Sequence, residues 1–207
     1  MKLTHSQVEL DELFQTYVEY LYRDTTGQIQ YPKEQSQLLL DQKICVTYGE
    51  LLFPSLRQVL SSLPLTQEDV FLDMGSGLGK LALMVFYLGP MRQVRGIEAS
   101  LPLYEQSIKP LSELKLNCPE LFMGLRRLSL EYGNFLHADL SDITVAYCCS
   151  TCFSQNLLYE IGYKVNKTSN IRYMLSLRPI PSLTRLKFKG VIEVECSWDS
   201  ALCYIYS

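Results

Sequence analysis

The stretch Val70-Phe-Leu-Asp-Met-Gly-Ser-Gly-Leu-Gly-Lys80 decides the fold of this chain. An apolar run that ends in an acid and then in alternating glycines is typical of a buried parallel strand that turns directly into a helix. Glycine permits positive φ and lets the backbone approach a ligand with no Cβ in the way. The first N–H groups of the helix expected over 80–87 point at whatever lies above the strand. The stretch therefore predicts a corner that binds a phosphate or a nucleoside.

Two familiar glycine-rich loops do not fit the spacing of this corner. A phosphate-binding P-loop ends in Gly-Lys followed by Ser or Thr, whereas Lys80 is followed by Leu81. A dinucleotide-binding turn has its third glycine three residues after the second, and that position is Lys80. A second acid, Glu98, ends the next apolar segment about one βαβ unit downstream, where it would accept hydrogen bonds from ribose hydroxyls.

The pattern that is present, Asp73-x-Gly75-x-Gly77-x-Gly79, resembles motif I of class I S-adenosylmethionine-dependent methyltransferases. Their ligand has no phosphate to bind, so an acid at the strand tip can face the positively charged amine of the methionine moiety. The resemblance implies S-adenosylmethionine as the cofactor, with its amine beside Asp73 and its ribose beside Glu98.

Further motifs resemble one family of these enzymes, the non-SET histone-lysine methyltransferases (disruptor of telomeric silencing). Thr47-Tyr-Gly-Glu50 lies some two dozen residues before Asp73-Met-Gly-Ser-Gly77, and Gly96-Ile-Glu98 and Gly133-Asn-Phe-Leu136 follow in the same order as in the family. The resemblance covers roughly residues 46–155. Because four motifs in the right order are less common than any one of them, the resemblance is specific.

The resemblance assigns roles to individual positions. In the family, an acid holds the adenine amino group where this chain has Asn134; its side-chain oxygen can still accept that hydrogen bond, and Phe135 keeps a surface for stacking on the base. Tyr48 and Phe153 would shape the acceptor channel. The cofactor-binding positions implied are Thr47, Glu50, Asp73, Gly75, Ser76, Gly77, Glu98, Asn134 and Phe135; the catalytic positions implied are Tyr48, Cys149 and Phe153.

Two positions depart from the family pattern. Lys80 replaces a glutamine, and a cation near a sulfonium centre needs an acid such as Glu50 as its partner, unless the side chain points to solvent. Cys149 replaces an asparagine that fixes the transferable methyl and the target amine, and a thiol is a weak hydrogen-bond partner. Packing as small hydrophobes is an open alternative for Cys148, Cys149 and Cys152.

The whole chain predicts an α/β fold: a seven-stranded Rossmann-like methyltransferase sheet, mostly parallel with an antiparallel C-terminal hairpin, and helices on both faces. We expect a helical N-terminal extension, 1–46, before a methyltransferase core, 47–207. Apolar spacing predicts helices over 4–22, 32–40, 51–60 and 104–116. Further strands are expected over 128–132, 143–148, 171–177, 191–198 and 201–206. Trp198 is interpreted as a half-buried residue of the final hairpin.

Composition suits a single globular domain, because 47% of the 207 residues are hydrophobic and 20% are charged. A net charge of −3 argues against a strongly nucleic-acid-binding surface, although a local basic patch stays open. Among the seven cysteines, Cys149-x-x-Cys152 is not matched by a second Cys-x-x-Cys pair that could complete a zinc site. Free thiols in a reducing cytosol are therefore favoured over zinc or disulfides. We expect no metal, no membrane segment and a cytoplasmic location.

The leading functional hypothesis is a protein-lysine methyltransferase whose partner presents a lysine side chain. The neutral amine would attack the methyl carbon in line with the departing sulfur, and the protein would mainly align the two reactants. One alternative is a methyltransferase for RNA or a small molecule; the absence of an Asn/Asp-Pro-Pro-Tyr motif after the strand over 143–148 counts against a base amine. Another is a non-catalytic module that binds S-adenosylmethionine.

Overall fold

The computed structural model describes residues 6–25 and 49–207. The helix expected over 32–40 and the predicted site residues Thr47 and Tyr48 lie outside the described residues.

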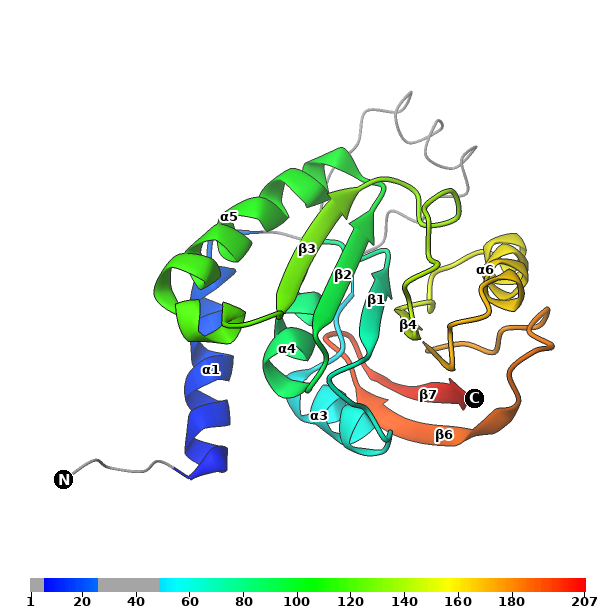
Figure 1. The fold of residues 1–207 in the computed structure, drawn as a ribbon, viewed down its shortest axis with the longest axis horizontal. Helices are drawn as coiled ribbons and strands as arrows, with labels where there is room; N and C mark the ends of the chain where they lie inside the picture. The colour runs from blue at the N-terminus through cyan, green and yellow to red at the C-terminus, as the bar shows by residue number, and fades with distance from the viewer. Residues whose placement is uncertain (1–5, 26–48) are drawn as a thin grey trace.

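A seven-stranded sheet forms the centre of the molecule (Figure 1), in the order β3-β2-β1-β4-β5-β7-β6. The strands are β1 (Val70–Met74), β2 (Gln93–Glu98), β3 (Arg127–Tyr132), β4 (Val145–Cys148), β5 (Tyr173–Ser176), β6 (Phe188–Glu195) and β7 (Ser200–Tyr206). The first five are parallel to their neighbours, whereas β7 is antiparallel to both β5 and β6. The predicted mostly parallel sheet with a C-terminal antiparallel hairpin is therefore confirmed.

Helices cover both faces of this sheet, as predicted. They are α1 (Gln7–Leu21), α3 (Phe53–Ser61), α4 (Lys80–Leu88), α5 (Leu101–Asn117) and α6 (Gln155–Lys167), with a short 3-10 helix, η1, over Pro119–Phe122. Figure 1 shows α6 on one side and α4 and α5 on the other. No helix in the described ranges 6–25 and 49–207 is long and apolar enough to span a lipid bilayer.

Strand β1 is buried on both faces, which explains why its sequence lacks polar alternation. Phe71 packs in the core beneath α1, α3, α4 and α5, whereas Leu72 and Met74 pack in the core beneath α6. The chain passes from β1 outward to β3 and then returns to β4 on the other side of β1. Such a reversal opens a crevice at the carboxyl ends of the strands, where ligands bind in this class of fold.

The strand predicted over 191–198 is displaced toward the N-terminus. The pairing of β6 with β7 is irregular between Phe188 and Gly190, and β6 ends at Glu195. The Cys196 N–H donates to the Asp199 carbonyl at 3.0 Å, and this tight turn takes Trp198 out of the strand. The boundary prediction was wrong because it depended on alternation alone, which does not register a bulge or a turn.

Helix α1 is firmly packed on the rest of the molecule. The ring of Phe14 stacks on Tyr87 of α4 with centroids 3.7 Å apart, and the Tyr22 hydroxyl, just after α1, donates to the Leu78 carbonyl at 3.0 Å. Leu78 lies in the glycine-rich turn after β1, so the N-terminal helix supports the segment that the sequence identified as decisive.

Asp69 ties together the segments that precede three strands. Its carboxylate, in a residue only 2% exposed, accepts hydrogen bonds from Arg172 Nε at 2.9 Å, Thr144 Oγ1 at 2.7 Å and the Thr66 N–H at 2.7 Å. Burial opposes ionisation, but the hydrogen bonds from Arg172 and Thr144 outweigh it and hold the pKa of Asp69 below its usual value. The charge is therefore maintained at neutral pH.

We expect Asp69→Asn to lower the free energy of unfolding at pH 7 by about 2–3 kcal/mol, because Arg172 and Thr144 lose a charged acceptor. Urea unfolding measures this loss. Since the pKa of Asp69 is depressed in the folded state, its stabilisation is present above pH ~4 and is lost as the pH falls. The difference in the free energy of unfolding between wild type and Asp69→Asn should thus shrink in acid. The control variant Asp24→Asn removes an exposed ion pair and should change the free energy of unfolding little at any pH. An equal loss in both variants would contradict this role.

Candidate active site

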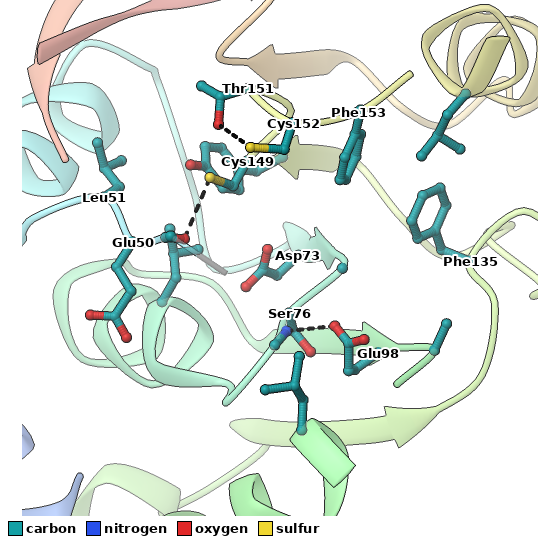
Figure 2. Close-up of a pocket in the computed structure, with 18 of the residues that line it drawn as sticks. Glu50, Leu51, Asp73, Ser76, Glu98, Phe135, Cys149, Thr151, Cys152 and Phe153 are labelled. Atoms are coloured by element: carbon teal, nitrogen blue, oxygen red, sulfur yellow. Dashed lines mark hydrogen bonds between the residues drawn. The ribbon is translucent and has the colours of Figure 1, made fainter. Parts of the chain in front are cut away.

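A cavity of about 230 Å³ opens at the carboxyl ends of β1, β2 and β4 (Figure 2), where the strand order reverses. The structure brings to it every predicted site residue in its described part. Those residues are Glu50, Asp73, Gly75, Ser76, Gly77, Glu98, Asn134, Phe135, Cys149 and Phe153.

The turn between β1 and α4 has the left-handed backbone that its glycines predict, with φ of +79° at Gly75, +54° at Gly77 and +76° at Gly79. A Cβ on Gly79 would also come within 2.5 Å of the Leu130 side chain. The turn therefore requires glycine both for its conformation and for its close contact with β3.

The N–H groups of this turn already have acceptors within the protein. The N–H groups of Gly75 and Ser76 donate to the Ile97 carbonyl at 2.9 and 3.1 Å, and the Gly77 N–H donates to Glu98 Oε2 at 2.7 Å. A turn that binds phosphate directs such groups at the ligand. The carboxylates of Asp73 and Glu98 line the cavity beside this turn instead, as the resemblance to motif I implied.

Glu98 is fixed at the end of β2. It is 6% exposed, and its carboxylate also accepts from the Ser100 N–H at 2.6 Å. Burial raises its pKa although these backbone hydrogen bonds act in the opposite direction. A buried carboxylate that is held in place in this way can accept hydrogen bonds from a pair of sugar hydroxyls.

Asp73, at the end of β1, is 3% exposed, and within residues 6–25 and 49–207 its carboxylate has no hydrogen-bond donor. Figure 2 shows it between Cys149 on one side and Ser76 on the other. Burial, with a smaller contribution from the charge of Glu98, raises the pKa of Asp73 to about 8. A buried carboxylate facing a cavity without a donor is suited to a cationic group such as the amine of S-adenosylmethionine.

Lys80 does not place its charge in the cavity. Its Nζ lies 2.7 Å from Glu50 Oε2, and both side chains are largely buried. The predicted pairing with Glu50 is confirmed, and the alternative that Lys80 points to solvent is wrong. The pairing neutralises the cation that would otherwise repel a sulfonium centre.

Two aromatic rings form an apolar wall at the other end of the cavity. The centroids of Phe135 and Phe153 lie 6.5 Å apart, with their planes 22° from parallel. Phe153 thus lies beside the residue predicted to stack on adenine. The side-chain oxygen of Asn134 accepts a hydrogen bond from the Leu136 N–H at 2.9 Å, which orients the amide and uses one of its two acceptor sites.

Cys149 lies at the carboxyl end of β4, and its thiol donates weakly to the Gly49 carbonyl, with sulfur and oxygen 3.5 Å apart. Burial raises its pKa far above the usual range, so the thiol stays protonated and is a poor nucleophile. Cys148 and Cys152 flank it as further free thiols. Over the described ranges, no group of three His, Cys, Asp or Glu is placed to hold a metal ion.

Trp198 and Tyr147 are among the lining residues that were not predicted as site residues. Trp198, 44% exposed, borders the cavity and covers Gly49, where any Cβ would collide with its ring. Tyr147, 1% exposed, lines the cavity from β4. The hydroxyl of Tyr147 within the otherwise apolar strand predicted over 143–148 could have indicated a site residue. The position of Trp198 depends on a turn that the sequence did not reveal.

The family model described as "Histone methylation protein DOT1" matches residues 42–178. No curated protein matches the sequence.

Many solved structures share the fold. The Bacillus subtilis M1A22 tRNA methyltransferase TrmK is 12% identical, with a TM-score of 0.55, covering 75% of this chain and 66% of that one. An RNA methyltransferase from Salinibacter ruber, in complex with S-adenosyl-L-homocysteine, is 16% identical, with a TM-score of 0.52 and coverage of 73% and 90%. M. capricolum TrmK, also with S-adenosylhomocysteine, is 10% identical, with a TM-score of 0.52 and coverage of 73% and 66%.

These comparisons, together with the fit of the cavity, confirm the cofactor predicted from the sequence, S-adenosylmethionine. At identities this low, the structural similarities show the fold and do not identify the methyl acceptor.

The raised pKa of Asp73 predicts how the stability of the unliganded protein depends on pH. Because this pKa lies above its ordinary value near 4, the contribution of Asp73 to stability is fully present below pH ~4 and is lost as the pH rises through about 8. As the pH rises from 5 to 9, we expect the free energy of unfolding of Asp73→Asn to increase relative to that of wild type by more than about 1 kcal/mol. Urea unfolding at several pH values measures the difference; a difference that did not vary with pH would contradict the assignment.

Proposed function

The chain belongs to the family of the histone methylation protein DOT1, and on this premise we propose that it transfers the methyl group of S-adenosylmethionine to a nitrogen atom of a macromolecule. The observation that carries the proposal is the Asp73 carboxylate, which is buried and faces the cavity without a donor in the described part of the chain. An ammonium group would supply a donor to this carboxylate, and Glu98 lies on the neighbouring strand for the sugar.

We assign the remaining contacts along the cavity in the same way. Gly75, Ser76 and Gly77 let the cofactor lie close to the backbone, and Phe135 stacks on the base while the Asn134 amide meets its edge. Glu50 acts by neutralising Lys80. The predicted contacts of Thr47 and Tyr48 belong to the same proposal.

When bound, the cofactor supplies an electrophilic methyl group on a positively charged sulfur. Asp73 would hold the amine and Glu98 the ribose, the groups on either side of the sulfonium, so that the methyl group would keep one orientation; such alignment can contribute ~7–11 kcal/mol in favourable cases. Trp198 and Phe153 provide apolar walls that exclude water, and an apolar channel favours the neutral, reactive form of an amine. Cys149 contributes packing and one weak hydrogen bond, so no side chain is assigned as a general base.

Two acceptor classes are supported by different observations. The similarity to structures of RNA and tRNA methyltransferases supports the RNA alternative better than the protein lysine favoured from the sequence. The family description, which names histone methylation, supports the lysine. Within residues 6–25 and 49–207, the cavity is lined by no Lys or Arg that would attract a phosphate backbone, which also suits a lysine.

We expect isothermal titration calorimetry to show S-adenosylmethionine binding to the wild type and at least tenfold weaker binding to Glu98→Gln, because the sugar loses a charged acceptor. The matched control is Glu68→Gln, which changes an exposed side chain outside the cavity. Thermal unfolding verifies that both variants fold. Equal affinity of Glu98→Gln and wild type would contradict the placement of the ribose.

The acceptor is determined by incubating the protein with methyl-labelled cofactor and a cell lysate, and then digesting separate samples with ribonuclease or protease. Label that is released by ribonuclease supports RNA, and label released by protease and recovered in methyl-lysine supports a protein. Asp73→Asn should abolish either signal. Cofactor binding without transfer to any fraction would contradict methyl transfer and support the non-catalytic module.

A further inference from the structure

Tyr147 carries a buried hydroxyl that the proposed contacts do not use. Its side chain is 1% exposed and lines the cavity. The hydroxyl contacts the Cys149 thiol, and this contact acts to lower the pKa of the thiol against the larger effect of burial. Sulfur is a weak acceptor, and within the described ranges of the chain no hydrogen bond of normal geometry reaches the hydroxyl. Leaving such a group unsatisfied destabilises the folded protein, so a partner supplied by a ligand would recover stabilisation.

The backbone register places this hydroxyl on the same face of the sheet as Asp73. Asp73 of β1 pairs directly with Tyr147 of β4 in a parallel ladder, and directly paired residues project to the same side. The charge of Asp73 contributes to raising the pKa of Tyr147, after the larger effect of burial. Tyr147 is therefore a neutral donor adjacent to the carboxylate that receives the cofactor amine.

The methionine moiety of the cofactor carries a carboxylate on the same carbon as its amine. Whatever binds the carboxylate must consequently lie next to Asp73. Among the described residues, the cavity is lined by no Lys, Arg or His, so within this part of the chain the role falls to a neutral donor.

Other side-chain hydroxyls and amides of the lining are directed elsewhere. Ser76 Oγ lies close to Gly96 on β2, Thr151 donates to Cys152, and the Asn134 amide is engaged at the opposite end of the cavity. Tyr147 is the lining hydroxyl that the strand register places beside Asp73.

We propose that the Tyr147 hydroxyl donates a hydrogen bond to the carboxylate of the methionine moiety and so positions the methyl donor together with Asp73. This inference rests on the proposed function and adds a specificity residue to it: Asp73 selects the ammonium group, and Tyr147 selects the carboxylate attached to the same carbon. The site therefore prefers nucleosides whose side chain carries both the amine and the carboxylate of an amino acid.

Three ligands test this assignment by calorimetry at pH 7: S-adenosylhomocysteine, which has both the amine and the carboxylate; decarboxylated S-adenosylmethionine, which has the amine alone; and 5′-methylthioadenosine, which has neither. We expect Tyr147→Phe to weaken the first ligand about tenfold, equivalent to about 1.4 kcal/mol, and the other two by less than twofold. Tyr159→Phe, on the exposed surface of α6, is the matched control. The unliganded Tyr147→Phe protein should unfold at the same or a higher temperature, because it loses only an unsatisfied hydroxyl.

An equal loss for all three ligands would overturn the inference, because it would indicate general damage to the cavity. So would unchanged affinity for S-adenosylhomocysteine together with a raised KM for the acceptor, which would place the hydroxyl on the acceptor instead. Both results leave the proposed function intact. If the wild type bound none of the three nucleosides, the proposed function itself would fail.

Discussion

The hydrogen bonds between the glycine turn and the end of β2 determine the geometry on which the site depends. Gly75, Ser76 and Gly77 all donate to acceptors at Ile97 and Glu98, so the tips of two strands are locked together. The lock places two carboxylates in one desolvated cavity, an arrangement that raises both pKa values. Burying two carboxylates together destabilises their charged forms, and a cationic nucleoside bound in the same cavity would offset this destabilisation.

The sequence predicted the helices, strands and turns whose geometry depends on residues adjacent in the chain. The run from Val70 to Lys80 specified a strand, a turn and a helix, because burial on both faces and three positive φ angles leave few alternatives. The remaining strands followed from apolar runs and alternation, and the seven-stranded sheet is the one expected. Most predicted site residues converge because carboxyl ends of parallel strands share one edge.

Long-range contacts were harder to predict. Trp198 reaches the cavity only because Cys196 turns back on Asp199, and Tyr147 gains its importance from its register with Asp73 across two strands that are far apart in sequence. A single sequence does not encode such pairings in any short window. The Lys80–Glu50 pair was foreseeable only as a chemical requirement, since an unpaired cation there would oppose the ligand.

The position of β7 has a consequence for the order of events during synthesis. This strand lies between β5 and β6, and the turn before it supplies Trp198 over Gly49. Residues 200–206 must therefore pair with β5 and β6 before the final hairpin is complete and Trp198 can cover Gly49 at the cavity. A nascent chain that stalls before this hairpin would expose one edge of β5 and an incomplete cavity. Chaperones bind such unpaired strand edges and exposed apolar surfaces.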